Sequence, residues 1–137
     1  MKLAIIGSRN LIIENLSNYI KQDVDEIVSG GAKGPDSAAV NYAKEHNIRF
    51  TEFLPDYYRY KRSAPLKRNQ KIAEYADEAL AFWDGSSKGT LYTIALFKKL
   101  GKKVTIIKFW IILKKYKVNI IQKNQREEKT SLFFILQ

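Results

Sequence analysis

Short apolar runs alternate with segments of helical spacing along the first 109 residues of this chain. Runs typical of buried strands, bounded by turn residues, occupy residues 2–6, 26–28, 48–54, 79–83 and 104–109. Between them, apolar residues recur three and four positions apart, and Pro35 and Pro65 suit the first turns of two predicted helices. Five strands alternating with four helices predict an α/β protein, a Rossmann-like three-layer sandwich with a parallel sheet of about five strands.

Two of the predicted helices are defined by particular apolar side chains. Ile13, Leu16 and Ile20 stand at helical spacing, which predicts a helix directly after the first strand. A helix over residues 88–100 is expected to end at Gly101. The side chains of that helix expected to face the core are Leu91, Ile94 and Ala95.

The alternation stops near residue 109, so residues 1–109 are expected to form one domain and residues 110–137 a basic extension that the pattern does not assign. The net charge of +10 lies mostly toward the end. Residues 1–100 hold 15 Lys and Arg against 12 Asp and Glu, whereas residues 101–137 hold 9 against 2. Such a tail attracts phosphate backbones non-specifically, and it is equally the composition of a solvated face.

Composition narrows the chemistry. The chain has no cysteine and a single histidine, His46, so we expect no disulfide, no metal site and no histidine-based triad. Its apolar runs are shorter than a membrane span, and its first residues do not resemble a signal peptide. A cytoplasmic protein without a membrane partner is therefore expected.

Four polar segments end predicted strands or begin the helices that follow, and these positions gather at one edge of a parallel sheet. The most informative is residues 29–39, SGGAKGPDSAA, which places glycines between a strand and a helix. The candidate site residues of the four segments are Gly7, Ser8 and Arg9; Gly30, Gly31, Ala32, Lys33, Gly34 and Asp36; Arg68 and Asn69; and Asp84, Ser86, Ser87, Lys88, Gly89 and Thr90.

These residue types suit an anionic ligand that carries a sugar. Glycines let backbone N–H groups approach a ligand closely, and the positive end of a helix dipole favours phosphate. Arg9 and Arg68 can grip phosphate or carboxylate with a planar fork of donors. The polar groups expected at sugar hydroxyls are Asp36, Asp84, Asn69 and Thr90.

Each residue alone also has a purely structural interpretation. Ser8 and Ser87 suit helix caps, Asp36 suits the dipole of its own helix, and Arg9 suits an exposed surface. Lys33 and Lys88 suit solvated positions. The convergence of all four segments on one edge is what favours a binding site.

The order of these motifs, GSR, SGGAKGPDSAA, RN and ADEALAFWDGSSKGT, resembles the SLOG superfamily of Rossmann-like nucleotide-binding proteins, most closely its small bacterial members. The resemblance covers about residues 2–104. It implies nucleotide binding at the carboxyl edge of the sheet, with no metal and no further cofactor.

Two relatives within that superfamily imply different activities. LOG-type phosphoribohydrolases cleave the N-glycosidic bond of nucleoside monophosphates with a Gly-Gly-x-Gly-Thr loop that is closely followed by a catalytic glutamate. In this chain Leu91, Tyr92 and Thr93 follow Gly89-Thr90, so that glutamate is absent and no catalytic residue is assigned. Asp36 is the remaining, weaker candidate for glycoside chemistry.

The other relative, the Rossmann-like domain of DNA-processing protein A, binds single-stranded DNA. Residues 56–63, DYYRYKRS, are expected to form a loop between Pro55 and Pro65, and their alternating tyrosines and cations suit stacking on bases. Stacking on one base of a small ligand, or ordinary packing, would use the same residues.

The leading hypothesis is a domain that binds a nucleotide or a nucleotide-derived small molecule, with sensing of that molecule as the role such binding would serve. An N-glycosidic hydrolase and a single-stranded nucleic-acid binder are the alternatives. The sequence is also compatible with two further partners, nucleic acid and a second copy of the chain.

Overall fold

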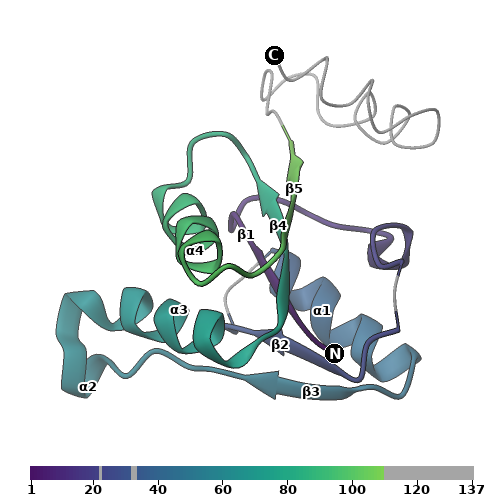
Figure 1. The fold of residues 1–137 in the computed structure, drawn as a ribbon, viewed down its shortest axis with the longest axis horizontal. Coiled ribbons are helices and arrows are strands. Elements are labelled where there is room, and N and C mark those ends of the chain that lie inside the picture. The colour runs from purple at the N-terminus through teal and green to yellow at the C-terminus, as the bar shows by residue number, and fades with distance from the viewer. Residues whose placement is uncertain (22, 32–33, 110–137) are drawn as a thin grey trace.

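The computed structural model describes residues 1–21, 23–31 and 34–109, and it is built around a five-stranded parallel sheet (Figure 1). The strand order is β3-β2-β1-β4-β5, and every neighbouring pair is parallel. This confirms the predicted α/β class. The strands are β1 (Lys2–Gly7), β2 (Glu26–Ser29), β3 (Arg49–Glu52), β4 (Glu78–Trp83) and β5 (Val104–Lys108).

Helices cover both faces of the sheet. Helix α1 (Pro35–Glu45) lies on one face, whereas α3 (Ala64–Tyr75) and α4 (Lys88–Lys99) lie on the other (Figure 1). The alternation of side chains along each strand divides the core accordingly. The face under α1 buries Leu3, Ile5, Ile27, Leu80 and Phe82, and the face under α3 and α4 buries Ala4, Ile6, Val28, Ala79 and Ala81.

The helix predicted after β1 is not formed. The described residues between β1 and β2 contain only a short 3-10 helix, η1 (Leu16–Asn18), and no α-helix. Two of the three apolar side chains that predicted this helix are nevertheless buried, because Ile13 and Leu16 join the core under α1 together with Leu11, and Ile20 packs against that core partly buried. Asparagine has a low helix propensity, so a helix is disfavoured by the three asparagines of this segment, Asn10, Asn15 and Asn18. Hydrophobic spacing thus predicted the burial correctly and the conformation wrongly.

The inward face of α4 differs from the prediction. Ile94 is buried as expected, but Leu91 is 49 % exposed and Ala95 is exposed. Thr93 is buried in their place, because its hydroxyl donates to the carbonyl of Gly89 and so needs no other partner. The buried residues of α4 are Thr90, Thr93, Ile94 and Phe97.

The segment expected to be a loop is largely helical. It forms α2 (Tyr57–Tyr60) and the 3-10 helix η2 (Lys61–Ser63). The Asp56 carboxylate caps α2 by accepting from the backbone N–H of Arg59 at 3.1 Å. Sequence spacing missed this helix because only four residues form it.

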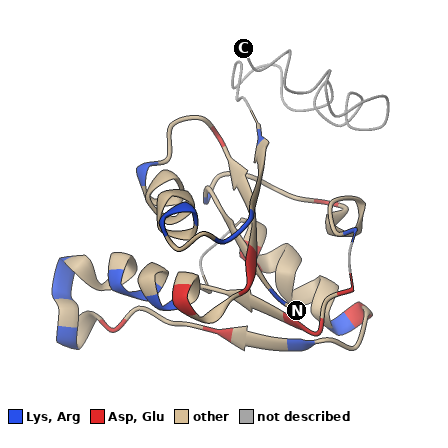
Figure 2. Cartoon of the chain, viewed as in Figure 1, with Lys and Arg blue, Asp and Glu red and all other residues tan. Residues whose placement is uncertain are grey.

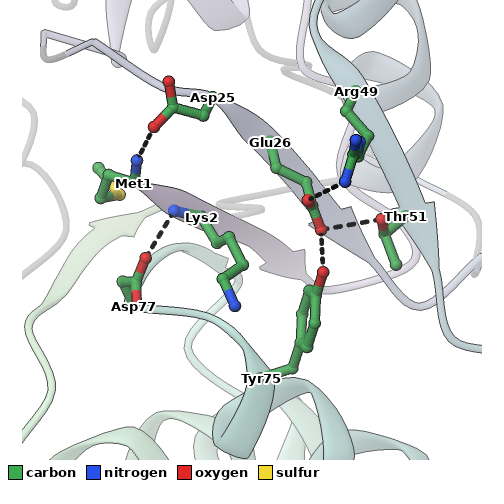
Figure 3. Close-up of polar contacts among 8 residues, drawn as sticks. All are labelled: Met1, Lys2, Asp25, Glu26, Arg49, Thr51, Tyr75 and Asp77. Atoms are coloured by element: carbon green, nitrogen blue, oxygen red, sulfur yellow. Dashed lines mark hydrogen bonds and ion pairs between the residues drawn. The ribbon is translucent and has the colours of Figure 1, made fainter.

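A polar network stands at the amino edge of the sheet (Figure 3). The carboxylate of Glu26, which is only 5 % exposed, accepts from the hydroxyls of Tyr75 at 2.5 Å and Thr51 at 2.9 Å. The guanidinium of Arg49 lies 3.7 Å from the same carboxylate. Burial raises the pKa of Glu26, but these hydrogen bonds and charges outweigh it, so the pKa lies below its ordinary value.

Some of the sequence-based expectations fall on residues that the structure does not describe. These are the extension over residues 110–137 and the site residues Ala32 and Lys33. In the part of the chain that is described, no helix is long and apolar enough to cross a membrane.

Candidate functional site

A cavity of about 420 Å³ opens at the carboxyl edge of the sheet, between the ends of β1 and β4. This is the point where the strand order reverses, since the chain leaves β1 toward β2 and later returns to β4 on the other side. Ligands of open parallel sheets bind at such points. We call this cavity the switch-point cavity.

All four predicted segments reach the switch-point cavity. Two arginines and two aspartates line it, together with small and amide residues. The predicted residues that line the cavity are Gly7, Ser8, Arg9, Gly30, Asp36, Arg68, Asn69, Asp84, Ser87, Gly89 and Thr90. Four described residues that were predicted with them do not line it, namely Gly31, Gly34, Ser86 and Lys88.

Ser8 joins the two central strands at the floor of the cavity. Its backbone N–H donates to the carbonyl of Phe82 at 2.9 Å, and its hydroxyl accepts from the N–H of Asp84 at 3.2 Å. The side chain is almost fully buried. Ser8 is therefore not a helix cap, which was its alternative interpretation, and it fixes the spacing of the β1 and β4 ends.

The glycine loop before α1 is shaped by close packing. Gly34 has φ +83°, and a Cβ there would stand 2.9 Å from the carbonyl oxygens of Ser8, Arg9 and Leu11. At Gly7 a Cβ would stand 2.5 Å from the Pro35 ring. Only glycine fits these positions. The loop therefore needs its glycines to pack against the segment after β1, whether or not a ligand is present.

Asp36 occupies the positive end of the α1 dipole. It lies in the first turn of α1, is buried, and accepts a hydrogen bond from the hydroxyl of Ser29. A carboxylate at this position already complements the helix dipole, and it repels a second anion. The α1 terminus is thus better suited to a hydroxyl donor than to a phosphate.

Arg68 reaches back from α3 to the glycine loop. Its Nη1 donates to the carbonyl of Gly30, and its Nε donates to the Asn69 side chain at 2.7 Å. Burial lowers the pKa of Arg68, while the nearby Asp36 carboxylate opposes that shift, and an arginine stays cationic at neutral pH. Arg68 therefore serves as a structural brace between β2 and α3, with its charge at the cavity.

The loop between β4 and α4 is held by its own side chains. The Oδ1 atom of Asp84 accepts from the backbone N–H groups of Ser86 at 2.9 Å and Ser87 at 2.8 Å. Burial raises the pKa of Asp84, but these hydrogen bonds outweigh it and leave the pKa below its ordinary value. The Trp83 indole N–H donates to the Ser87 carbonyl at 3.0 Å. These hydrogen bonds hold the loop in one conformation, with the start of α4 at the cavity.

The start of α4 differs from the start of α1 in two respects. Ser87 caps α4 by accepting from the N–H of Thr90, and the first turn holds no acidic residue. In addition, a Cβ built on Gly89 would meet nothing within 4 Å, so packing does not require a glycine there. Gly89 leaves open space at a helix start whose first turn holds no acidic residue, and this favours an anion there; the nearest carboxylate in the sequence, Asp84, is held by the N–H groups just before the helix.

The apolar part of the lining was not predicted as part of the site. Pro65 and Leu66 come from the first turn of α3, and Ile72 follows two turns later. In the sequence these residues show only the apolar spacing of a helix, and that spacing does not distinguish a core residue from a residue that lines a cavity. The lining residues outside the predicted set are Ile5, Ile6, Asn10, Pro65, Leu66, Ile72 and Thr93.

Comparison with known proteins assigns no function: no family model matches the chain, and no curated protein or solved structure matches it significantly. A functional assignment therefore rests on the geometry and chemistry of the switch-point cavity.

Proposed function

We propose that this chain is a SLOG-type domain that binds a nucleotide or a nucleotide-derived small molecule in the switch-point cavity. The observation that carries the proposal is the meeting of all four predicted segments at one cavity of about 420 Å³. That volume lies within the range of small-molecule sites, and the lining combines an apolar wall with a few converging polar groups.

The contrast between the two helix starts orients the ligand. A phosphate is favoured over α4, where Gly89 leaves room and the first turn holds no acidic residue, and Arg9 is an exposed cation of the same cavity lining. It is disfavoured over α1, where Asp36 is buried. These features favour the loop between β4 and α4 over the glycine loop before α1 as the phosphate site of the proposal.

The remaining groups suit the rest of a nucleotide. The Asp36 carboxylate and the Asn69 amide can bind ribose hydroxyls. Leu66, Pro65 and Ile72 offer an apolar wall for a base. A cavity with two cations and two carboxylates matches a ligand that is anionic at one end and rich in hydroxyls at the other.

Gly89 provides the test. In Gly89→Asp the new carboxylate occupies the first turn of α4, so the dipole and helix propensity should stabilise the fold by about 0.5–1.5 kcal/mol. The same carboxylate should abolish phosphate binding. We expect AMP, ADP-ribose or a cyclic nucleotide to raise the Tm of the wild-type chain and to leave the Tm of Gly89→Asp unchanged.

Gly89→Ala is the matched control, since it adds a Cβ without a charge and should keep part of the ligand-induced shift. Full binding by Gly89→Asp would exclude a phosphate over α4. No stabilisation of the wild-type chain by any of these nucleotides would refute the proposed function. Release of free base from a nucleoside monophosphate, lost in Asp36→Asn, would instead establish the hydrolase alternative.

A further inference from the structure

A second surface begins at the rim of the switch-point cavity and extends away from it. It forms the end of the molecule where α2, η2 and the first half of α3 lie, and Lys and Arg dominate that end (Figure 2). We call it the tyrosine–cation surface and define it by Tyr57, Tyr58, Arg59, Tyr60, Lys61, Arg62, Lys67 and Lys71.

The tyrosines of this surface are poorly explained by packing. Tyr58 is 91 % exposed and Tyr57 is 56 % exposed, and neither belongs to a core cluster. Two large exposed rings on a short helix cost hydration free energy without stabilising a core. Their position therefore points to a partner with flat, apolar faces.

The cations of the surface surround the rings. The Lys61 ammonium lies 5.4 Å from the centre of the Tyr58 ring. Around the Tyr60 ring, the corresponding distances are 5.7 Å for Arg59, 5.8 Å for Lys67 and 6.0 Å for Lys71. Cations held close to aromatic faces can bind phosphates while a base stacks on a neighbouring ring.

The charge of this surface is not balanced from within. Among residues 1–21, 23–31 and 34–109, no carboxylate forms an ion pair with Arg59, Lys61, Arg62, Lys67 or Lys71. Asp56, the acidic residue beside them, caps α2 with its carboxylate. A row of unpaired cations favours a polyanion over a neutral partner.

We propose that the tyrosine–cation surface binds single-stranded nucleic acid, with bases stacked on Tyr57 and Tyr58 and with the phosphate backbone along Arg59, Lys61, Arg62 and Lys67. A single strand is favoured over a duplex because its bases are free to stack on exposed rings. The inference is independent of the proposed function, since none of these residues lines the switch-point cavity.

Fluorescence anisotropy of labelled oligo-dT and oligo-U, about 15 nucleotides long, tests the surface on the full chain. We expect Tyr57→Ala/Tyr58→Ala to weaken binding about ten-fold or more, and Tyr57→Phe/Tyr58→Phe to retain it because the rings remain. Lys61→Ala/Arg62→Ala should reduce the slope of log K against log salt by about 1.4, for two lost contacts to a single strand.

Lys98→Ala/Lys99→Ala is the matched charge control. It removes two exposed cations from the last turn of α4, at the opposite edge of the sheet, and should change neither affinity nor slope. Equal effects of the two lysine-containing double variants would overturn the proposal, because binding would then follow net charge, including that of residues 101–137. Undiminished binding by Tyr57→Ala/Tyr58→Ala, or equal affinity for a duplex of the same length, would also overturn it.

Two measurements keep these outcomes interpretable. The exposed positions should leave the Tm within about 2 °C of wild type, which confirms folding. The nucleotide-induced Tm shift should persist in Lys61→Ala/Arg62→Ala, so that loss of nucleic-acid binding is distinguishable from failure of the cavity. DNA and RNA probes in parallel show whether the 2′-hydroxyl contributes.

Discussion

Glu26 carries a charge that is buried and satisfied at the amino edge of the sheet, remote from the cavity (Figure 3). Three partners hold it, and the two hydroxyls of Tyr75 and Thr51 matter more than the ion pair, because the Arg49 side chain is 75 % exposed and screened by water. A carboxylate with such partners is a structural element of the β2–β3 edge.

The pH dependence of stability should report on Glu26. Its pKa in the folded state lies below the ordinary 4.5, so the unfolded chain takes up the proton first as the pH falls. The stabilisation is therefore present above that value and is lost as the pH falls through the folded-state pKa. Glu26→Gln should lose about 1–2 kcal/mol at neutral pH and show a flatter decline below about pH 4.5.

Urea unfolding between about pH 7 and pH 3.5 measures the difference. Glu45→Gln, an exposed position on α1, is the control and should follow the wild-type curve. Parallel curves for wild type and Glu26→Gln would show that the network does not hold the charge as described.

Lys102 stabilises the end of α3 through hydrogen bonds, whereas Lys103 is exposed. The Lys102 ammonium donates to the carbonyls of Ala73 at 2.7 Å, Glu74 at 2.9 Å and Ala76 at 2.8 Å, at the end of α3, where the last carbonyls of a helix lack intrahelical partners. Lys102→Met should destabilise the protein by about 1–3 kcal/mol in urea unfolding. Lys103→Met, with the same change at an exposed position, should stay within about 0.5 kcal/mol.

The two loops that begin α1 and α4 use glycine for different reasons. Gly34 is required by a left-handed φ and by three backbone carbonyls at 2.9 Å, whereas Gly89 has neither constraint. Gly34→Ala should therefore lower the free energy of unfolding by about 2–4 kcal/mol, through strain and a forced shift of the segment after β1. Thermal unfolding of the two Gly→Ala variants checks this, and an unchanged Tm for Gly34→Ala would contradict it.

That difference between the two glycines cannot be read from the sequence, where residues 29–39 are the most informative segment because of their glycines. What could be predicted was the position of both loops, because strand and helix periods locate the strand ends. The role of each glycine depends on contacts with distant residues, such as the Ser8 and Leu11 carbonyls beside Gly34. Likewise, the spacing of Ile13 and Leu16 predicts that they are buried, whereas apolar spacing alone does not determine whether that segment is an α-helix.

The parallel sheet explains why separate segments form one cavity. Because all five strands run in the same direction, they end at the same edge, so segments from four parts of the sequence lie together without any local signal linking them. The alternating pattern therefore predicted the polar half of the cavity. The apolar half, including Leu66 and Ile72, comes from helix faces whose pattern is that of an ordinary core.

The two arginines of the cavity should contribute differently to the stability of the free protein. Arg9 is exposed, whereas Arg68 is half-buried and bridges the glycine loop and α3. Arg9→Ala should therefore leave the Tm of the free protein nearly unchanged, and Arg68→Ala should lower it, because the Gly30 carbonyl loses its partner. With nucleotide at about 100 times its Kd, wild type should gain about 2.7 kcal/mol.

Thermal unfolding with and without nucleotide separates the two effects. The gain should shrink in both variants, since each removes a cation from the cavity, while the free-protein Tm falls only in Arg68→Ala. Arg68→Lys keeps the charge but not the planar fork, so it should recover part of the ligand-induced shift and little of the free-protein Tm. If Arg9→Ala instead lowered the free-protein Tm and left the shift intact, Arg9 would be a structural residue and the phosphate would have to lie elsewhere in the cavity.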